Sequence, residues 1–291
     1  MKACFIFNPH SGCNRRNPVV LERARAFLAQ HWAGASLVFT ERPGHGTELA
    51  RRALDAGCDL VVAIGGDGTM NEVAQTLVGT SAVFGLIPCG SGNGLGRHLG
   101  IPGPGCGAFR TLLHGRPRAI DTGTVNGLPF FNTMGLGFDA EIGRRFNLLK
   151  RRSLVHYLRV GAGAFFRFQS EALTIRNGIR EVATRAMLVT VANSDQYGNN
   201  AFVAPGARVD DGELDLVAVK AIGFFGLLPL TARLFLGSFD RSSSVLHLRG
   251  CHFIIRRDAP GVIHTDGELH ETGAEIDVSI RPRSLRVMVP A

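Results

Sequence analysis

The sequence predicts an α/β N-terminal domain with a mostly parallel sheet, followed by a β-rich C-terminal sandwich domain. Three observations lead to this fold class. Strand-like and helix-like segments alternate up to about residue 118, strands dominate the remainder, and 291 residues suffice for two domains of about 100–200 residues each. We place residues 1–120 in the first domain, which residues 282–291 can rejoin, and residues 121–281 in the second.

The first half alternates strands and helices. Helices are expected from Asn17-Pro18, at residues 47–56 and at residues 69–78, because caps or closing glycines bound them. This order places helices on both faces of a parallel sheet. The short apolar runs that are typical of buried strands lie at residues 3–7, 36–39, 60–64 and 83–87.

The second half contains strand-like runs joined by turns. Two helices are inserted, at about residues 148–168 and 224–236, and a last strand at residues 284–289 fits either domain. The second helix lies in an apolar stretch that contains Pro229 and Arg233, so we interpret it as a core or interfacial helix and not as a membrane span. The expected strands lie at residues 130–132, 171–176, 186–192, 214–220, 245–248, 252–256 and 275–281.

Composition narrows the classes of partner. A net charge of +8 favours polyanions, but no dense basic run with interleaved aromatic residues is present, so no nucleic acid is expected. The positive charge fits two interpretations: contact with an anionic membrane surface, or a basic protein without such a role. Six scattered cysteines without a CxxC pair argue against zinc and disulfides. No signal segment precedes the first strand, so the expected location is the cytoplasm, including the inner face of the membrane.

The most informative segment joins the third expected strand to a helix: Gly65-Gly66-Asp67-Gly68-Thr69. Glycines let the backbone approach a ligand closely, and a helix start offers unpaired N–H groups that suit phosphate. A carboxylate at Asp67 makes sense beside phosphates if Mg²⁺ bridges them. The alternative is a tight strand–helix turn with Asp67 as N-cap. The segment matches neither a Walker loop nor the dinucleotide fingerprint.

Two further small, polar loops follow strands. Asn8-Pro9-His10-Ser11-Gly12 comes after the first strand, and Gly90-Ser91-Gly92-Asn93-Gly94 comes after the fourth. In a parallel sheet, all three loops lie at the carboxyl ends of neighbouring strands, where ligands bind. Packing alone does not readily explain three such loops at one edge, so the sequence predicts a phosphate-ligand site there.

The loops and their order resemble the catalytic domain of the diacylglycerol kinase family, which includes bacterial lipid kinases, sphingosine kinases and ceramide kinases. Matching segments continue at Asp121-Thr122-Gly123, residues 135–140, residues 205–215 and Asp266-Gly267-Glu268. The resemblance implies an N-terminal domain like that of NAD kinases and phosphofructokinases. It also implies transfer of the ATP γ-phosphate to a lipid hydroxyl, with Mg²⁺ as cofactor.

The resemblance implies roles for individual residues of the first domain. Asp67 and Asp121 would belong to an acidic cluster that organises the catalytic Mg²⁺. Many bacterial members have Asp at the position of Gly94, whereas sphingosine kinases have a small residue. The resemblance therefore does not decide which lipid accepts the phosphate. The ATP site would be lined by Asn8, Pro9, Ser11, Gly12, Thr40, Gly65, Gly66, Asp67, Gly68, Thr69, Asn71, Glu72, Ser91 and Asn93.

Further roles fall in the second domain. Glu268 matches the family's general base, which would accept the hydroxyl proton, although Asp266-Gly267-Glu268 also fits a hairpin turn. The acidic segment around Asp211 resembles a structural Mg²⁺ loop, with the Asp211 side chain and the carbonyls of Arg208 and Glu213 as ligands; the alternative is an acidic turn.

The remaining expectations concern the lipid substrate, contact with a membrane, the oligomeric state and competing functions. Asp139 stands where sphingosine kinases place an acid near the substrate head, or it caps a helix. Basic and apolar residues mix at 148–168, which fits a helix on an anionic membrane or a solvated face. A lipid substrate is expected, and an exposed sheet edge would allow a homodimer. The competing functions are a catalytically weak nucleotide- or lipid-binding homologue and a soluble-substrate kinase such as an NAD kinase.

Overall fold

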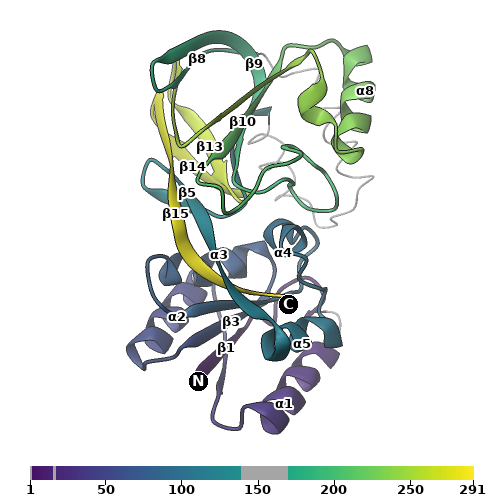
Figure 1. Cartoon of the computed structure of the whole chain (residues 1–291), viewed down its shortest axis with the longest axis vertical. Coiled ribbons are helices and arrows are strands. Elements are labelled where there is room, and N and C mark those ends of the chain that lie inside the picture. Colours follow the sequence, from purple (N-terminus) through teal and green to yellow (C-terminus); the bar gives the residue numbers. More distant parts are fainter. Residues whose placement is uncertain (1, 16–17, 139–169) are drawn as a thin grey trace. The chain divides into compact units, whose positions relative to one another are not determined.

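The computed structural model of the chain describes residues 2–15, 18–138 and 170–291. It contains two compact units (Figure 1). The first comprises Met1–Thr122 and Pro282–Ala291, and the second comprises Gly123–Arg281. The chain therefore returns to the first unit at its C-terminal end.

A parallel sheet forms the centre of the first unit. Its strands follow the order β15–β4–β3–β1–β2, and all four pairings are parallel. Both faces of β1, β3 and β4 are buried, which explains their uninterrupted apolar sequences. The parallel α/β arrangement expected from the sequence is confirmed. The strand bounds are β1 (Ala3–Phe7), β2 (Ser36–Phe39), β3 (Leu60–Gly65), β4 (Val83–Pro88) and β15 (Glu275–Val289).

Helices cover both faces of this sheet. On one face, α1 and α5 share a core with the strands, and the Phe27 ring of α1 lies 5.0 Å from the Phe109 ring of α5. Helices α2 and α3 contact each other and, respectively, β1 and β3. Helix α3 begins two residues earlier than expected, at Asp67. The helix bounds are α1 (Val19–His31), α2 (His45–Asp55), α3 (Asp67–Leu77), α4 (Gly94–His98) and α5 (Cys106–His114).

The second unit is an antiparallel β structure. Its strands follow the order β14–β13–β7–β9–β8–β12–β15, with β10 on β9 and β11 on β10. Phe130, Phe253 and Ile255 are among its fully buried core residues. The β-rich sandwich domain is confirmed. Its strands are β6 (Leu128–Phe130), β7 (Thr133–Gly137), β8 (Glu171–Asn177), β9 (Arg180–Ala192), β10 (Leu214–Lys220), β11 (Val245–Gly250), β12 (His252–Arg257), β13 (Gly261–Thr265) and β14 (Glu268–Thr272).

Two strand expectations need correction. Residues 275–281 and 284–289 belong to one strand, β15, and not to two. The expected strand at residues 130–132 ends at Phe130, because the next three backbone N–H groups donate to the carboxylate of Asp266 and not to a sheet partner. A long-range side-chain contact therefore decides where this strand ends.

Helix α8 (Phe224–Phe235) is followed by a short 3₁₀ helix, η1 (Phe239–Arg241). The helix expected at residues 224–236 is confirmed. In the described part of the chain, no helix is both long and apolar enough to cross a membrane. The expectations for Asp139 and for residues 148–168 lie outside the described residues.

Candidate functional site

The three glycine loops lie at one edge of the parallel sheet. Strands β1, β3 and β4 are neighbours in parallel pairing, so their carboxyl ends meet there. Residues 8–14 follow β1, the Gly66 turn leads from β3 into α3, and residues 89–93 lead from β4 into α4. Strand pairing therefore confirms that the loops share one edge.

Hydrogen bonds join the first loop to the start of α3. Asn8 Nδ2 donates to Thr69 Oγ1 at 2.8 Å, and Ser11 Oγ lies 3.3 Å from the same hydroxyl. The backbone N–H of Gly66 donates to Ser11 Oγ at 3.2 Å. The side chains expected around ATP thus also hold two loops together, through the buried Thr69.

The loops approach one another at glycines. A Cβ atom placed on Gly12 would lie 2.1 Å from the carbonyl oxygen of Cys89. A Cβ atom on Gly90 would lie 2.9 Å from the Cα of Gly66. Separations this short exclude a side chain, so contact between the loops already requires glycine at these positions.

Asp67 joins the second and third loops. Its carboxylate accepts the backbone N–H groups of Asn93 at 3.0 Å and of Gly94 at 3.2 Å. Burial raises the pKa of the Asp67 carboxyl, and the two N–H donors act in the opposite direction. Desolvation destabilises the charged form of Asp67, and a cation bound beside it would stabilise that form.

The turn of the third loop depends on Asn93. This residue has a φ of 51°, a left-handed conformation that Asn tolerates better than most residues. Its side chain bridges the turn, because Oδ1 accepts the N–H of Gly90 at 3.0 Å and Nδ2 donates to the Gly90 carbonyl at 2.8 Å. Asn93 therefore shapes the loop that contacts Asp67.

The other predicted loop residues differ in exposure. Gly68 and Ser91 are exposed, Pro9 is half-buried, and Gly65 and Thr40 are buried. Thr40 follows β2, and its backbone N–H donates to the last carbonyl of β1 at 3.0 Å. The exposed Gly68 lies in the first turn of α3, where backbone N–H groups lack intrahelical partners.

Glu72 has a structural partner that the sequence does not reveal. Its two carboxylate oxygens accept the backbone N–H groups of Gly44 and Gly46, each at 2.8 Å. These groups belong to the start of α2, where a negative charge is stabilising. The structure therefore places the Glu72 carboxylate on the N-terminus of α2.

Asn71 is a buried polar group on α3. Its side chain is 8% exposed, and its Oδ1 atom is buried without a hydrogen-bond partner among the described residues. Asn71 follows Asp67 by one helical turn, so the two lie on the same side of α3. Buried polar atoms are normally paired, so this amide oxygen is suited to a bound ligand.

Asp121 contacts the backbone of β15. It lies in β5 (Arg116–Val125), is buried, and accepts the backbone N–H of Arg283 at 2.7 Å. In residues 2–15, 18–138 and 170–291, no group of three or more His, Cys, Asp or Glu side chains is arranged to hold a metal. The joint role of Asp67 and Asp121 in holding a catalytic Mg²⁺ stays a prediction.

Sequence reasoning missed Asn14. This buried side chain donates from Nδ2 to the carbonyls of Asn8, at 2.8 Å, and Ile64, at 3.3 Å. It joins the first loop to the end of β3. Its only signal in the sequence is a polar residue close behind the glycine of that loop, which does not distinguish an inward from an outward side chain.

The second unit contains the Asp266-Gly267 turn. Asp266 and Gly267 have φ values of 50° and 90°, and Thr265 pairs with Glu268, so the turn is a two-residue hairpin between β13 and β14. The hairpin interpretation of this motif is confirmed. Glu268 is exposed at the start of β14.

The Asp266 carboxylate binds the segment after β6. It accepts the backbone N–H groups of Phe131, Asn132 and Thr133 at 2.8–2.9 Å. The backbone N–H of Asp266 donates in return to the Thr133 carbonyl at 2.8 Å. These contacts fix the turn that presents Glu268.

Two histidines lie on the same hairpin. His264 Nδ1 accepts the N–H of Gly267 at 3.4 Å, and His270 Nε2 lies 2.8 Å from Thr265 Oγ1. Burial and the neighbouring His264 lower the pKa of His270. Both effects favour the neutral form of the His270 ring.

The acidic loop expected to hold a structural metal contains an internal cation. Arg249 Nη2 lies 2.6 Å from Asp211 Oδ2 and 3.0 Å from Glu213 Oε2, and Arg249 Nε lies 3.4 Å from Asp215 Oδ1. Arg208 pairs with Asp210 at 3.7 Å. Arg249 therefore competes with a cation for the Asp211 and Glu213 side chains, and the role of this loop as a metal site stays a prediction.

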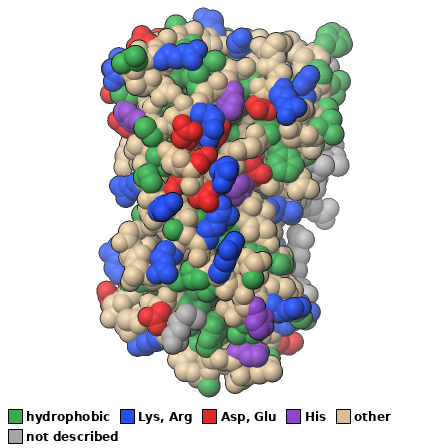
Figure 2. Space-filling model, in the orientation of Figure 1, with side chains coloured by type: hydrophobic (Ala, Val, Ile, Leu, Met, Phe, Trp, Pro, Cys, Tyr) green, Lys and Arg blue, Asp and Glu red, His purple; other side chains and the backbone are tan. Residues whose placement is uncertain are grey.

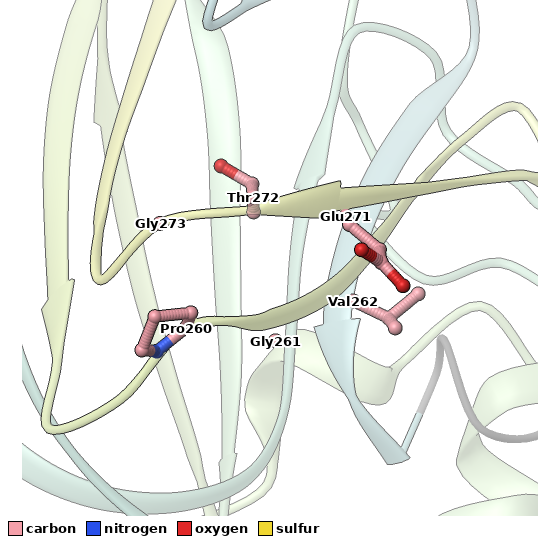
Figure 3. Close-up of a pocket in the computed structure, with 6 residues that line it drawn as sticks. All are labelled: Pro260, Gly261, Val262, Glu271, Thr272 and Gly273. Carbon is pink, nitrogen blue, oxygen red and sulfur yellow. The ribbon is translucent and has the colours of Figure 1, made fainter.

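A pocket of about 510 Å³ lies on the β13–β14 hairpin (Figure 3). It lies where Gly261 pairs with Thr272, at the opposite end of the hairpin from Glu268. No residue expected in the active site lines it. Its lining residues are Pro260, Gly261, Val262, Glu271, Thr272 and Gly273.

Comparisons with known families agree with the two-part architecture. Residues 2–125 match the diacylglycerol kinase catalytic domain. Residues 132–289 match the YegS C-terminal NAD kinase beta sandwich-like domain. The second match covers more than half of the chain.

Individual proteins point to the same family. A Pseudomonas aeruginosa (strain PAO1) protein named "Probable lipid kinase YegS-like" is 30% identical over 277 residues, covering 91% of this chain and 89% of that protein. A "Diacylglycerol kinase" of Mycobacterium tuberculosis (strain H37Rv) is 26% identical over 251 residues, covering 83% and 80%. A crystal structure of a diacylglycerol kinase from Bacillus anthracis shares the fold, with a TM-score of 0.75, 20% identity and coverage of 99% and 96%. The chain therefore belongs to the diacylglycerol kinase catalytic-domain family and is a lipid kinase.

Proposed function

We propose that the protein transfers the γ-phosphate of ATP to the hydroxyl of a lipid such as diacylglycerol or a sphingoid base. The observation that carries this proposal is the meeting of three glycine loops at one sheet edge, with Asp67 bonded across two of them. Exposed backbone at the start of α3 suits the phosphates of a nucleotide.

Mg²⁺ is the proposed cofactor of the first unit. Asp67 would hold it, because each carboxylate oxygen accepts one N–H group and keeps a further lone pair. The unpaired Asn71 Oδ1 would contact the nucleotide or a water of the metal. The cation would neutralise charge that develops on the transferred phosphoryl group.

Glu268 is the proposed general base. An exposed carboxylate at the edge of a rigid two-residue turn can receive a hydroxyl proton from a substrate that approaches from solvent or from a lipid surface. The three backbone N–H groups that donate to the Asp266 carboxylate would keep this turn in place during the reaction. Peripheral contact with a membrane follows from the lipid nature of the acceptor.

The test is phosphorylation of lipids in detergent micelles. The protein is incubated with labelled ATP, Mg²⁺ and a panel of diacylglycerol, sphingoid, ceramide and phosphatidylglycerol lipids, with NAD as a soluble acceptor. Glu268→Gln is compared with Glu271→Gln, a matched control because Glu271 is an exposed carboxylate of the same strand. We expect one lipid class to be labelled, with loss only in Glu268→Gln. Labelling of NAD alone, or equal activity of wild type and Glu268→Gln, would contradict the proposal.

A further inference from the structure

The Glu268 turn lies at an end of the second unit's sheet where other strands also begin or end. Strand β13 ends at Thr265, which pairs with Glu268 of β14 and with Met134 of β7. Strand β7 begins at Thr133, which pairs with Ala192, the last residue of β9. The segment before β7 and the segment after β9 therefore lie at the same end of the sheet as this turn.

Asn132, the last residue before β7, connects the turn to the segment after β9. Its backbone N–H donates to Asp266 Oδ1 in the turn at 2.8 Å. Its backbone carbonyl accepts the N–H groups of Asn193 at 2.9 Å and of Ser194 at 3.3 Å. Its side-chain Nδ2 donates to the Gln196 carbonyl at 2.9 Å, and its Oδ1 atom accepts the Ser194 hydroxyl. Each polar atom of Asn132 thus takes part in a contact with the turn or with the segment after β9.

The side chains that make these contacts are buried. Asn132 is 7% exposed, Gln196 4%, and Asn193 and Ser194 0%. Figure 2 shows charged side chains spread over the visible surface of the molecule, where water can solvate them. The buried amides and the buried hydroxyl have no such solvation, so they need partners within the protein. A buried network of this kind adds little net stability, but it holds its members in one arrangement.

The Ser194 hydroxyl matches the orientation of the Asn132 amide. An amide group has one accepting end and one donating end. The Gln196 carbonyl can only accept, so it requires Nδ2 on its side and leaves Oδ1 for the Ser194 hydroxyl. Asn193 adds a second connection, because its Nδ2 donates to the carbonyl of Phe131 at 2.8 Å. The segment before β7 is therefore held from the end of β9 as well as from the turn.

We propose that Asn132 and Ser194 are positioning residues that fix the Glu268 turn for proton transfer. This inference rests on the proposed function, in which Glu268 is the general base. A base has to lie within hydrogen-bond reach of the hydroxyl that it deprotonates, and a small misplacement of reacting groups can cost about 100-fold in rate. Asn132 acts on the turn through the Asp266 carboxylate, and Ser194 acts through the Asn132 amide. The alternative is that the network only stabilises the second unit.

The first test compares two Ser→Ala variants of the full chain. Ser194→Ala removes the hydroxyl that contacts Asn132 Oδ1, and Ser279→Ala removes a hydroxyl that lies 2.9 Å from Thr124 Oγ1 in the same unit. Lipid phosphorylation in detergent micelles and melting temperature are measured. We expect Ser194→Ala to lower kcat about tenfold with an unchanged KM for ATP, because the base is displaced and the nucleotide loops are not. Ser279→Ala should keep the wild-type kcat. Equal kcat values in wild type and both variants, at a temperature where all are folded, would overturn the proposal.

The second test asks whether the Ser194 hydroxyl acts through Asn132. Asn132→Ala should lower kcat about 100-fold, since both side-chain contacts with the segment after β9 are lost. The double variant Asn132→Ala/Ser194→Ala should match Asn132→Ala, because the hydroxyl then has no amide to orient. Losses that multiply would show that Ser194 acts on another group, which would overturn the proposal. If Asn132→Ala does not fold, the comparison of the two Ser→Ala variants decides.

The base itself provides the last comparison. In a Glu268→Gln background, Ser194→Ala should cause no further loss of turnover, since no base remains to be positioned. An additional tenfold loss in this background would show that the network serves another part of the site, and would overturn the proposal. Wild type that labels no lipid, or Glu268→Gln with wild-type turnover, would contradict the proposed function and with it this inference. An active wild type with an unaffected Ser194→Ala variant would contradict this inference alone.

Discussion

The carboxylate of Asp67, at the start of α3, accepts the backbone N–H of Gly94, at the start of α4, at 3.2 Å. The family resemblance associates the Gly94 position with Asp in many bacterial members. In this chain the contact with Asp67 uses the backbone of residue 94 and needs no side chain. The glycine therefore preserves the connection between the two loops, although it leaves Asp67 without a second carboxylate at this point.

Asp67→Asn should remove most kinase activity and keep the fold. The amide replaces one acceptor oxygen by a donor, which faces a backbone N–H and costs about 1–3 kcal/mol in the free energy of unfolding. Loss of the negative charge should lower kcat about 100-fold or more, since charge placement supplies most of phosphoryl-transfer catalysis. Turnover and urea unfolding are measured for Asp67→Asn and for Asp55→Asn, an exposed carboxylate of α2. Wild-type turnover in Asp67→Asn would exclude a role for the charge.

Gly12→Ala should destabilise the sheet edge at which the three glycine loops meet. Its Cβ would lie 2.1 Å from the Cys89 carbonyl oxygen, so one loop has to shift, at a cost of about 1–3 kcal/mol. The shift also displaces Ser11, which accepts the N–H of Gly66, so nucleotide affinity should fall. Gly34→Ala is the control, since nothing lies within 4 Å of its Cβ. Melting temperature and ATP binding are measured, and equal values for both variants would contradict the required close approach.

The sequence predicts that the three glycine loops meet at one sheet edge, because the residues that encode this arrangement are adjacent in sequence. Each loop follows a short apolar run, and parallel order brings the carboxyl ends of β1, β3 and β4 together without any knowledge of side-chain contacts. The Asp266-Gly267 turn is predictable for the same reason, since a hairpin of this type is encoded by two adjacent residues.

Contacts between distant residues could not be predicted. Glu72 looks like part of the nucleotide helix, but its carboxylate binds the start of α2, 26–28 residues earlier. Asp211 looks like a metal ligand, but its partner Arg249 is 38 residues away on β11. In both cases local residue type is compatible with a ligand, and only the tertiary fold supplies the competing partner.

Arg249→Met should make the acidic loop responsive to metal. Without the guanidinium, Asp211 and Glu213 lose their cationic partner and Asp215 keeps only its contact with His247, which should cost about 1–2 kcal/mol. Wild type should melt at the same temperature with Mg²⁺ or with EDTA, whereas Arg249→Met should melt lower and recover partly with Mg²⁺ or Ca²⁺. Arg256→Met, which breaks the exposed pair with Glu275, is the control. A wild-type melting temperature that falls in EDTA would instead indicate a metal at this loop.

His247→Gln should change how stability depends on pH. His247 Nε2 lies 2.6 Å from Asp215 Oδ1, and this hydrogen bond raises the pKa of His247 above 6.5. A raised pKa in the folded state stabilises the protein fully below pH 6.5, and this contribution disappears as the pH rises through the folded-state value. His247→Gln should therefore lose about 1 kcal/mol at pH 5.5 and converge with wild type at alkaline pH. Urea unfolding from pH 5.5 to alkaline pH measures the difference in the free energy of unfolding between wild type and His247→Gln. A difference that grows with pH would contradict the role given to the His247–Asp215 hydrogen bond.

Asp266→Ala should reduce catalysis through the position of Glu268. Asp266 accepts three backbone N–H groups and has a φ of 50°, which Asn tolerates and Ala does not. Its removal leaves those donors unpaired, and we expect a loss of about 2–4 kcal/mol in the free energy of unfolding.

If the turn positions the general base, Asp266→Ala should lower kcat and leave the KM for ATP unchanged, because ATP is assigned to the loops of the first unit. Asp266→Asn keeps the conformation and one acceptor oxygen, so it should restore part of both stability and kcat. Asp258→Ala, at an exposed carboxylate before β13, is the matched control. A stability loss in Asp266→Ala with unchanged kcat at a temperature where the variant is folded would show that the turn is structural only, and that Glu268 does not depend on it.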